Sequence, residues 1–522
     1  MGWVTALVGV PLSAAVLAAQ QPQPKPQQPV PQQPVQQQPP AAGGQGSAGA
    51  ASVSAAPGVV QPAGAGPASV PGAPAASTPA STVASGAVAA MFARVIRDTT
   101  LENGLQVIAI ENHQAPLTTV EVVVHTGAFT QDHGQEGVPH LYEHMLFKAY
   151  SGPHGNDWRA MMGELDGGYN GETGDENVRY HVTVPSDKVE GGMRALAELV
   201  RDPNFTQDDL NEERRVVLDE LDRDASDPIR GLYTRVGQRL WSTAWGRKDA
   251  GGDPAALATV TPKLLKQIFQ QYYVPNNSVV IVSGDVAPER VFQLAGERFS
   301  HWKRQPDPFA GVTPYAVPPM TRSQAVIVQG EAADVILVVE WQGPSVTSDP
   351  DGTYAADMLS SISDQSGSTF HRRLIDSGLF ASCNISYTTR AHVGPITLTA
   401  HTSVDSAKRA LIVLGTMLQH LADSDAFTDD ELINARQGKR VGLALELQEH
   451  ESIADDVAEF WGSAGLPYYR TYADRMGVVT RAEMQGFALR YLTGTPMAVG
   501  LLVPPGTGDQ LRPAVAAFLG LQ

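Results

Sequence analysis

From Gln106 onward, apolar and polar residues alternate in short runs that predict β-strands. Gln106 to Glu111 is a first run, and Thr118 to His125 is a second, with Val120, Val122 and Val124 at every other position. A period of two places these valines on one face of a strand, so the second run predicts a half-buried strand.

A helical pattern follows, in which apolar residues recur three and four positions apart. Val138, Leu141, Met145 and Leu146 share one face when the segment is drawn as an α-helix. We therefore predict a helix whose apolar face packs into a core.

The same helix carries His140, Glu143 and His144 in the order His-x-x-Glu-His. Histidines four positions apart lie one turn apart on one face, so both imidazoles can reach one metal ion. Zn²⁺ bound by two histidines and a carboxylate keeps a position open for water, and another carboxylate beside that water can accept its proton. The pattern predicts a hydrolytic zinc site, although it also occurs by chance and needs a third ligand from elsewhere.

A second, strongly charged helix offers candidates for that ligand. It begins at Thr206, a residue type that favours helix N-caps, and runs through Leu221. Glu213 and Glu220 are seven residues apart, about two turns, and Val217 lies between them on the same face. Glu220 is the candidate ligand, and Glu213 is a candidate for a supporting carboxylate that orients a ligand. The alternative is an ordinary charged surface helix, which spacing alone favours.

The strand predicted from Asn177 to Val184 has two interpretations. An exposed edge strand could bind a substrate peptide as an additional strand, whereas an ordinary core strand is paired on both sides. The sequence leaves both open.

The second half of the chain repeats the pattern of the first. Phe205 to Leu210 matches Phe427 to Leu432, and Tyr272 to Val286 resembles Tyr491 to Pro504. In each half, strands lead into helices and then into a closing strand. The simplest architecture is a duplicated α+β unit with two homologous domains.

The two copies differ in chemistry. At an offset of 222 residues, Glu220 corresponds to Gly442 and Glu213 corresponds to Ala435. We therefore predict that only the first copy binds metal.

The N-terminal part has a different composition. Residues 2–19 are almost wholly apolar and end in small residues, which is typical of a secretory signal peptide, with an uncleaved membrane anchor as the alternative. Residues 20–92, rich in Gln, Pro, Ala and Gly, predict a disordered linker. We predict a zinc-bearing domain at 93–310 and a second repeat domain at 320–522. This organisation predicts a periplasmic or secreted protein, anchored to a membrane only if the apolar segment is retained.

Charge and cysteine content change this picture little. A formal net charge of −18 over 522 residues argues against nucleic acid as a partner and suits peptide substrates only weakly. Cys383 is the only cysteine, so no internal disulfide can form.

Taken together, these patterns resemble the pitrilysin/insulinase-type zinc metallopeptidases, especially the bacterial and mitochondrial-processing-peptidase-like members. The resemblance covers roughly residues 95–520. It rests on Gly137 to Phe147, Tyr169 to Thr173, Glu213 to Glu220 and Tyr272 to Asp285.

This resemblance implies a role for each candidate residue. His140, His144 and Glu220 would bind zinc, Glu143 would be the catalytic base, and Glu213 would support the site. It also implies two similar domains, each an antiparallel sheet with helices packed on one side, which face each other across a chamber for extended peptides. The implied activity is that of a zinc metalloendopeptidase acting on peptides or unfolded protein segments.

The chain departs from the family pattern in its second half. Active members often carry an Arg and a Tyr there, which hold the substrate and its developing oxyanion. Aligned on Gly378-Leu379, these positions are Leu374 and Ala381.

Two explanations follow from this departure. In some relatives the zinc ligands and the Arg/Tyr pair lie on different subunits, so we hypothesise a dimer in which a paralogous subunit supplies the pair. Within this chain, Arg372, Arg373 or Tyr387 could substitute. The alternative function is that of a non-catalytic partner or scaffold subunit of a peptidase complex.

Overall fold

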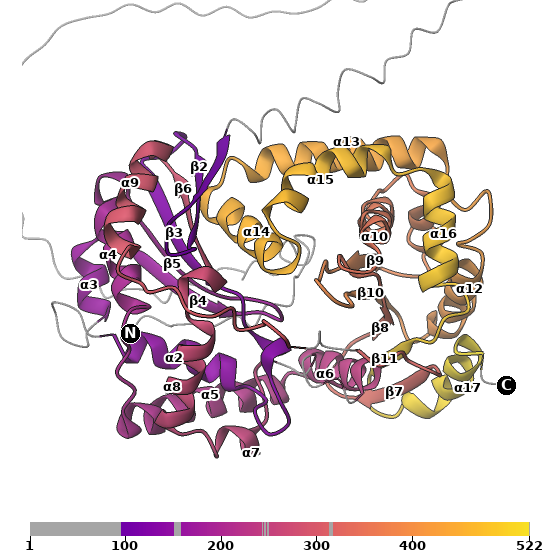
Figure 1. Cartoon of the computed structure of the whole chain (residues 1–522). Helices are drawn as coiled ribbons and strands as arrows, with labels where there is room; N and C mark the ends of the chain where they lie inside the picture. Colours follow the sequence, from indigo (N-terminus) through magenta and orange to yellow (C-terminus); the bar gives the residue numbers. More distant parts are fainter. Residues whose placement is uncertain are drawn as a thin grey trace, which may run out of the picture. The chain divides into compact units, whose positions relative to one another are not determined.

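The computed structural model describes residues 95–150, 158–242, 244, 247, 250–312 and 317–520. The predicted signal peptide or anchor and the predicted linker lie outside the described residues. The described part contains two sheets, each packed against helices (Figure 1). No helix in these described ranges is long and apolar enough to cross a membrane.

The first sheet has six strands in the order β1-β2-β6-β3-β5-β4. Neighbouring strands are antiparallel except β2 and β6, which are parallel. The strands are β1 (Ile96–Thr100), β2 (Gln106–Glu111), β3 (Leu117–Val124), β4 (Gly168–Thr173), β5 (Val178–Pro185) and β6 (Ser278–Gly284).

One face of this sheet packs on helices of the first half. Val120, Val122 and Val124 of β3 lie in the same core as Leu141 and Met145. The helices of the first half, of which α6 packs on the second sheet, are α2 (Val138–Lys148), α3 (Trp158–Glu164), α4 (Val189–Leu199), α5 (Gln207–Ser226), α6 (Pro228–Trp241), α7 (Pro254–Leu257), α8 (Pro262–Tyr272) and α9 (Pro288–Phe299).

The second sheet has five strands in the order β7-β11-β8-β10-β9, and its one parallel pair is β7 with β11. The strands are β7 (Gln324–Gln329), β8 (Val335–Gln342), β9 (Ser382–Tyr387), β10 (Pro395–Thr402) and β11 (Ala498–Val503). The helices are α10 (Pro350–Ser363), α11 (Thr369–Leu374), α12 (Ala407–Gln419), α13 (Asp429–Glu446), α14 (His450–Ser463), α15 (Leu466–Val478), α16 (Arg481–Tyr491) and α17 (Gly508–Phe518).

The two halves exchange one helix each. Helices α6 and α14 occupy equivalent positions at the offset of 222 residues, yet α6 packs on β7, β8 and β11 whereas α14 packs on β3 and β6 (Figure 1). Leu232 and Val236 of α6 share a core with Val338 of β8. Each sheet is therefore covered on its second face by a helix from the other half.

The prediction of two homologous α+β halves is confirmed, and two details differ from it. Each sheet is mixed rather than purely antiparallel, because its closing strand, β6 or β11, runs parallel to one neighbour. Helices cover both faces rather than one, because of the exchanged helices. The exact domain limits stay a prediction.

Candidate metal centre

Helix α2 is embedded in the core of the first half. Every residue from Val138 to Leu146 is buried. Its N-cap, Gly137, has a φ of 85°, and a Cβ there would lie 2.6 Å from the backbone oxygen of Gly251, so only glycine fits. The Gly137 N–H donates a hydrogen bond to Gln131 Oε1 at 2.6 Å. These contacts fix the start of the helix.

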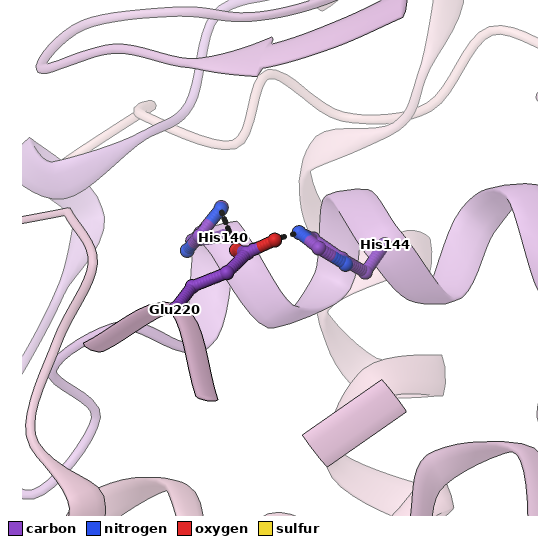
Figure 2. Close-up of side chains that lie close together, drawn as sticks. All are labelled: His140, His144 and Glu220. Atoms are coloured by element: carbon purple, nitrogen blue, oxygen red, sulfur yellow. Dashed lines mark ion pairs between the residues drawn. The ribbon is translucent and has the colours of Figure 1, made fainter. Parts of the chain in front are cut away.

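Helix α5 brings Glu220 to the two histidines of α2. Glu220 Oε2 lies 3.9 Å from His140 Nε2 and 3.6 Å from His144 Nε2 (Figure 2). One ligand atom from each residue lies within 4.8 Å of the other two. The structure thus brings together the three side chains predicted as ligands, although their metal binding stays a prediction.

The polar atoms of this cluster fit a zinc ion. Both ring nitrogens of His140, Nε2 of His144 and Oε2 of Glu220 are buried with no hydrogen-bond partner among the described residues. Such unpaired atoms are costly unless a ligand satisfies them. Burial, with a smaller effect of His144, lowers the pKa of His140 to about 3, so its imidazole stays neutral and can donate a lone pair. Two imidazoles and one carboxylate are a typical donor set for catalytic Zn²⁺.

Glu213 contacts Nδ1 of His144, the ring nitrogen on the side away from Glu220. Glu213 Oε2 lies 3.2 Å from His144 Nδ1, and Glu213 Oε1 lies 3.2 Å from Lys148 Nζ. Burial alone would raise the pKa of Glu213, but the contacts with His144 and Lys148 lower it below its ordinary value, so this carboxylate is ionised. Glu213 is positioned to orient His144, as the sequence predicts.

Glu143 lies beside the cluster but does not belong to it. Thr173 Oγ1 of β4 donates a hydrogen bond to Glu143 Oε2 at 2.8 Å. A Cβ at Gly171 would lie 2.7 Å from Glu143 Oε1, so the edge strand packs closely on this carboxyl group. Burial raises the pKa of Glu143 to about 7, although His144 and Thr173 oppose this shift. A carboxyl group with such a pKa can accept and release a proton near neutrality.

The edge strand next to the site is β4. Strand β5 pairs with β3 on one side and β4 on the other, so the segment from Asn177 to Val184 is an interior strand. The interpretation of that segment as a substrate-binding edge was wrong, and Gly168–Thr173 occupies the edge instead. Pairing order depends on distant strands, which a local pattern does not specify.

Sequence reasoning assigned no role to Thr173 or Lys148. Thr173 lies in a segment that carries the family resemblance, but only the pairing of β4 with β5 brings it to Glu143. Lys148 had a local signal, because it follows His144 by one helical turn and therefore shares its face.

The suggested substitutes for the Arg/Tyr pair make contacts within the second half. The Tyr387 hydroxyl donates to the Pro344 carbonyl oxygen at 3.1 Å. Arg372 Nη2 donates to Thr369 Oγ1 at 3.1 Å, and Arg373 lines a cavity of about 250 Å³ with Phe370. The side chains of Arg372 and Tyr387 are therefore engaged within the second half.

Two protein families and several known proteins are similar to this chain. Residues 106–252 match the family described as Insulinase (Peptidase family M16), and residues 259–439 match the one described as Peptidase M16 inactive domain. Zinc protease PqqE of Helicobacter pylori is 28% identical over 226 residues, which are 42% of this chain and 50% of that protein. The match thus spans half the length of that relative. The probable mitochondrial-processing peptidase subunit beta of Arabidopsis thaliana is 23% identical over 430 residues, 78% of each chain.

Solved structures show the same fold. A protease from Helicobacter pylori superposes with a TM-score of 0.67 at 18% identity, covering 78% of this chain and 99% of that one. The first half of the periplasmic protease PqqL from Escherichia coli also gives 0.67 at 18% identity, covering 82% and 96%. A structure described as a peptidase M16 inactive domain from Pseudomonas fluorescens gives 0.67 at 18% identity, covering 78% and 98%.

Proposed function

Because this chain belongs to the insulinase family of peptidases, peptidase family M16, we propose that it is a zinc-dependent endopeptidase that hydrolyses peptides or unfolded protein segments. One observation carries the proposal. The buried ligand atoms of His140, His144 and Glu220 converge without hydrogen-bond partners in the described part of the chain, and Glu143 lies beside them. Relatives named zinc proteases support the choice of metal.

The reaction would divide between the metal and the protein. Zn²⁺ held by His140, His144 and Glu220 would activate a water molecule and polarise the scissile carbonyl. We expect Glu143 to accept the proton of the attacking water and to return it to the leaving amine. The hydrogen bond from Thr173 holds one oxygen of Glu143, which leaves the other for this exchange. Glu213 would hold the His144 ring in the orientation that the metal needs.

We further propose that the substrate peptide binds along β4. Among the strands that the structure describes, β4 is paired with β5 alone, so its other edge has backbone groups available for an added strand. Since Thr173 at the end of β4 contacts Glu143, a peptide paired with β4 would pass directly beside the proposed base.

The lack of an Arg and a Tyr at the positions expected from the family pattern supports a partner subunit. Leu374 and Ala381 occupy the expected positions, and Arg372 and Tyr387 are engaged within their own half. We propose that a paralogous subunit supplies the pair in a heterodimer. The Arabidopsis relative is itself named as a subunit of a processing peptidase. We propose a periplasmic or secreted location, because a similar structure is described as that of a periplasmic protease and the sequence of residues 2–19 is typical of a signal peptide.

A second candidate function is that of a non-catalytic partner or scaffold subunit. The same missing pair favours it, and one of the similar structures is described as an inactive domain. The two candidates differ in turnover and not in fold.

Cleavage of a library of unstructured peptides by the full chain with Zn²⁺ tests the proposal, beside Glu143→Gln as the matched control. Cleavage that Glu143→Gln abolishes while zinc content is unchanged supports a peptidase that acts alone. If neither protein cleaves, a paralogue that carries the Arg/Tyr pair is added to both. Turnover that then depends on Glu143 supports the heterodimer, and no turnover under either condition refutes the peptidase in favour of the scaffold.

A further inference from the structure

Three other potential metal ligands meet on the opposite face of the first sheet. Glu121 of β3 and His181 of β5 are directly paired in the antiparallel register, and Asp455 comes from α14 of the second half. One ligand atom of each lies within 4.8 Å of the other two. Val120 packs in the core that contains α2, so the adjacent Glu121 points to the other face. This group, the α14 cluster, is therefore separated from the His140 site by the sheet.

Glu121 is a buried carboxylate without a hydrogen bond. Its side chain is 0% exposed, and neither of its oxygens has a hydrogen-bond partner in the part of the chain that the structure describes. The nearest cation is Arg179, whose Nε lies 3.8 Å from Glu121 Oε1 and 3.6 Å from Asp455 Oδ1. These distances exceed hydrogen-bond range. A buried carboxylate in this position is costly unless a further cation or a proton neutralises it.

The charges around Arg179 do not balance. This one guanidinium forms ion pairs with Glu172, Glu121 and Asp455, so one positive charge faces three carboxylates. His181 does not correct the excess, because its Nε2 lies 3.5 Å from a fourth carboxylate, Glu451 Oε1. With all three carboxylates ionised, two negative charges remain uncompensated among the groups that Arg179 contacts, which matches the charge of one divalent cation.

We propose that Glu121, His181 and Asp455 bind a divalent metal ion of the zinc type. One imidazole nitrogen and two carboxylate oxygens are donors that suit Zn²⁺ and similar ions. The Asp455 side chain is 35% exposed, so an ion can reach the site from solvent. Because the ligands come from β3, β5 and α14, the ion joins the sheet of the first half to the exchanged helix of the second. Its role is structural, and its binding energy adds to the stability of this contact.

The competing explanation is a proton. Burial raises the pKa of Glu121 well above its ordinary range, and Asp455 adds to this effect. A protonated Glu121 would remove part of the charge excess without any metal. The two explanations differ in metal content, so they can be separated directly.

Metal stoichiometry of the full chain tests the proposal, with Zn²⁺ or Co²⁺ as the probe and elemental analysis after gel filtration as the readout. Wild type is expected to bind two ions per chain, whereas Glu121→Gln and Asp455→Asn each bind one. Glu121→Gln has the shape of the protonated residue, so it is expected to fold. Asp456→Asn is the matched control on α14, since Asp456 lies outside the α14 cluster and is expected to keep two ions.

The outcomes separate the two sites. Loss of one ion in Glu121→Gln, with the remaining ion lost on adding His144→Ala, supports the proposal. Addition of Zn²⁺ should also raise the thermal midpoint of His144→Ala but not of the variant that also carries Glu121→Gln. A wild type whose single ion is lost in His144→Ala, or a Glu121→Gln that binds as much metal as wild type, would overturn the proposal and favour the proton. Failure of the His140 site alone would appear as one ion that His144→Ala leaves in place.

Discussion

Glu213 holds His144 from the side of the ring that faces away from Glu220. The Glu213 Oε2 to His144 Nδ1 distance is 3.2 Å, while His144 Nε2 lies 3.6 Å from Glu220 Oε2. A proton on Nδ1 donated to Glu213 leaves the lone pair on Nε2, the nitrogen that faces the other ligands. Glu213 thus sets both the tautomer and the direction of a predicted ligand.

We predict that Glu213→Ala weakens zinc binding while the protein stays folded. Without the carboxylate, the His144 ring can rotate or change tautomer, and loss of such a supporting contact typically lowers metal affinity about 10- to 100-fold. Competition with a chromophoric chelator measures this change. Glu212→Ala is the matched control, because Glu212 also pairs with Lys148 but its side chain is 61% exposed. Equal zinc affinity in the two variants would contradict the assignment of Glu213.

We predict that Glu143→Gln retains zinc and loses turnover. The amide keeps the size of the side chain and can still accept the hydrogen bond from Thr173, but it cannot take a proton. Loss of a general base typically costs about 10²- to 10⁴-fold in rate. Peptide cleavage and zinc content are measured on the same preparation. His144→Ala provides the contrast, since it should lose the metal as well, and a Glu143→Gln protein without zinc would argue for a different role.

The face on which each candidate ligand lies could be predicted from the sequence, because that part of the geometry is local to each of two helices. The spacing of His140 and His144 fixes their common face on α2, and the spacing of Glu213 and Glu220 does the same on α5. The contact between these helices is not local. It came from the family resemblance, since the residues alone favoured a surface helix for α5.

The features that could not be predicted from the sequence depend on contacts between distant segments of the chain. Periodicity predicted the strand at 177–184 but not its place between β3 and β4. An amphipathic pattern shows which face of a helix is buried but not against which sheet, so the exchange of α6 and α14 was not foreseen. Glu121 did leave a signal, a carboxylate between Val120 and Val122, but its neighbour Asp455 is on the exchanged helix.

We predict that Arg390→Met strongly destabilises the contact between the halves. Arg390 lies after β9 and is buried, and its Nε donates to Asp175 Oδ2 at 3.0 Å while Nη1 pairs with Glu459 Oε1. Removing one partner of a buried ionic network leaves uncompensated charges and typically costs about 3–5 kcal/mol of unfolding free energy. Urea unfolding of the full chain measures the loss. Arg475→Met is the control, since the exposed pair with Asp351 should contribute about 1 kcal/mol or less.

Glu340 offers a test of pH dependence away from both candidate metal sites. It lies on β8, where it is 9% exposed, and its Oε1 accepts a hydrogen bond from Thr397 Oγ1 at 3.4 Å. The charge of Glu340 also raises the pKa of Tyr233, a residue of α6. Burial raises the pKa of Glu340 to about 7, although the Thr397 hydrogen bond opposes this.

The sign of the pH effect follows from this shift. The folded protein holds the proton on Glu340 up to about pH 7, whereas the unfolded chain releases it near the ordinary value of 4.5. The wild-type protein should therefore be most stable, relative to Glu340→Gln, below about pH 4.5, and should lose that stability as the pH rises through 7, by at most about 1.4 kcal/mol per pH unit. Urea unfolding of both proteins between pH 5 and about 8 measures the difference. Glu297→Gln, on the exposed surface of α9, should show no such trend. A difference that stays constant across this range would mean that Glu340 is ionised in the folded protein.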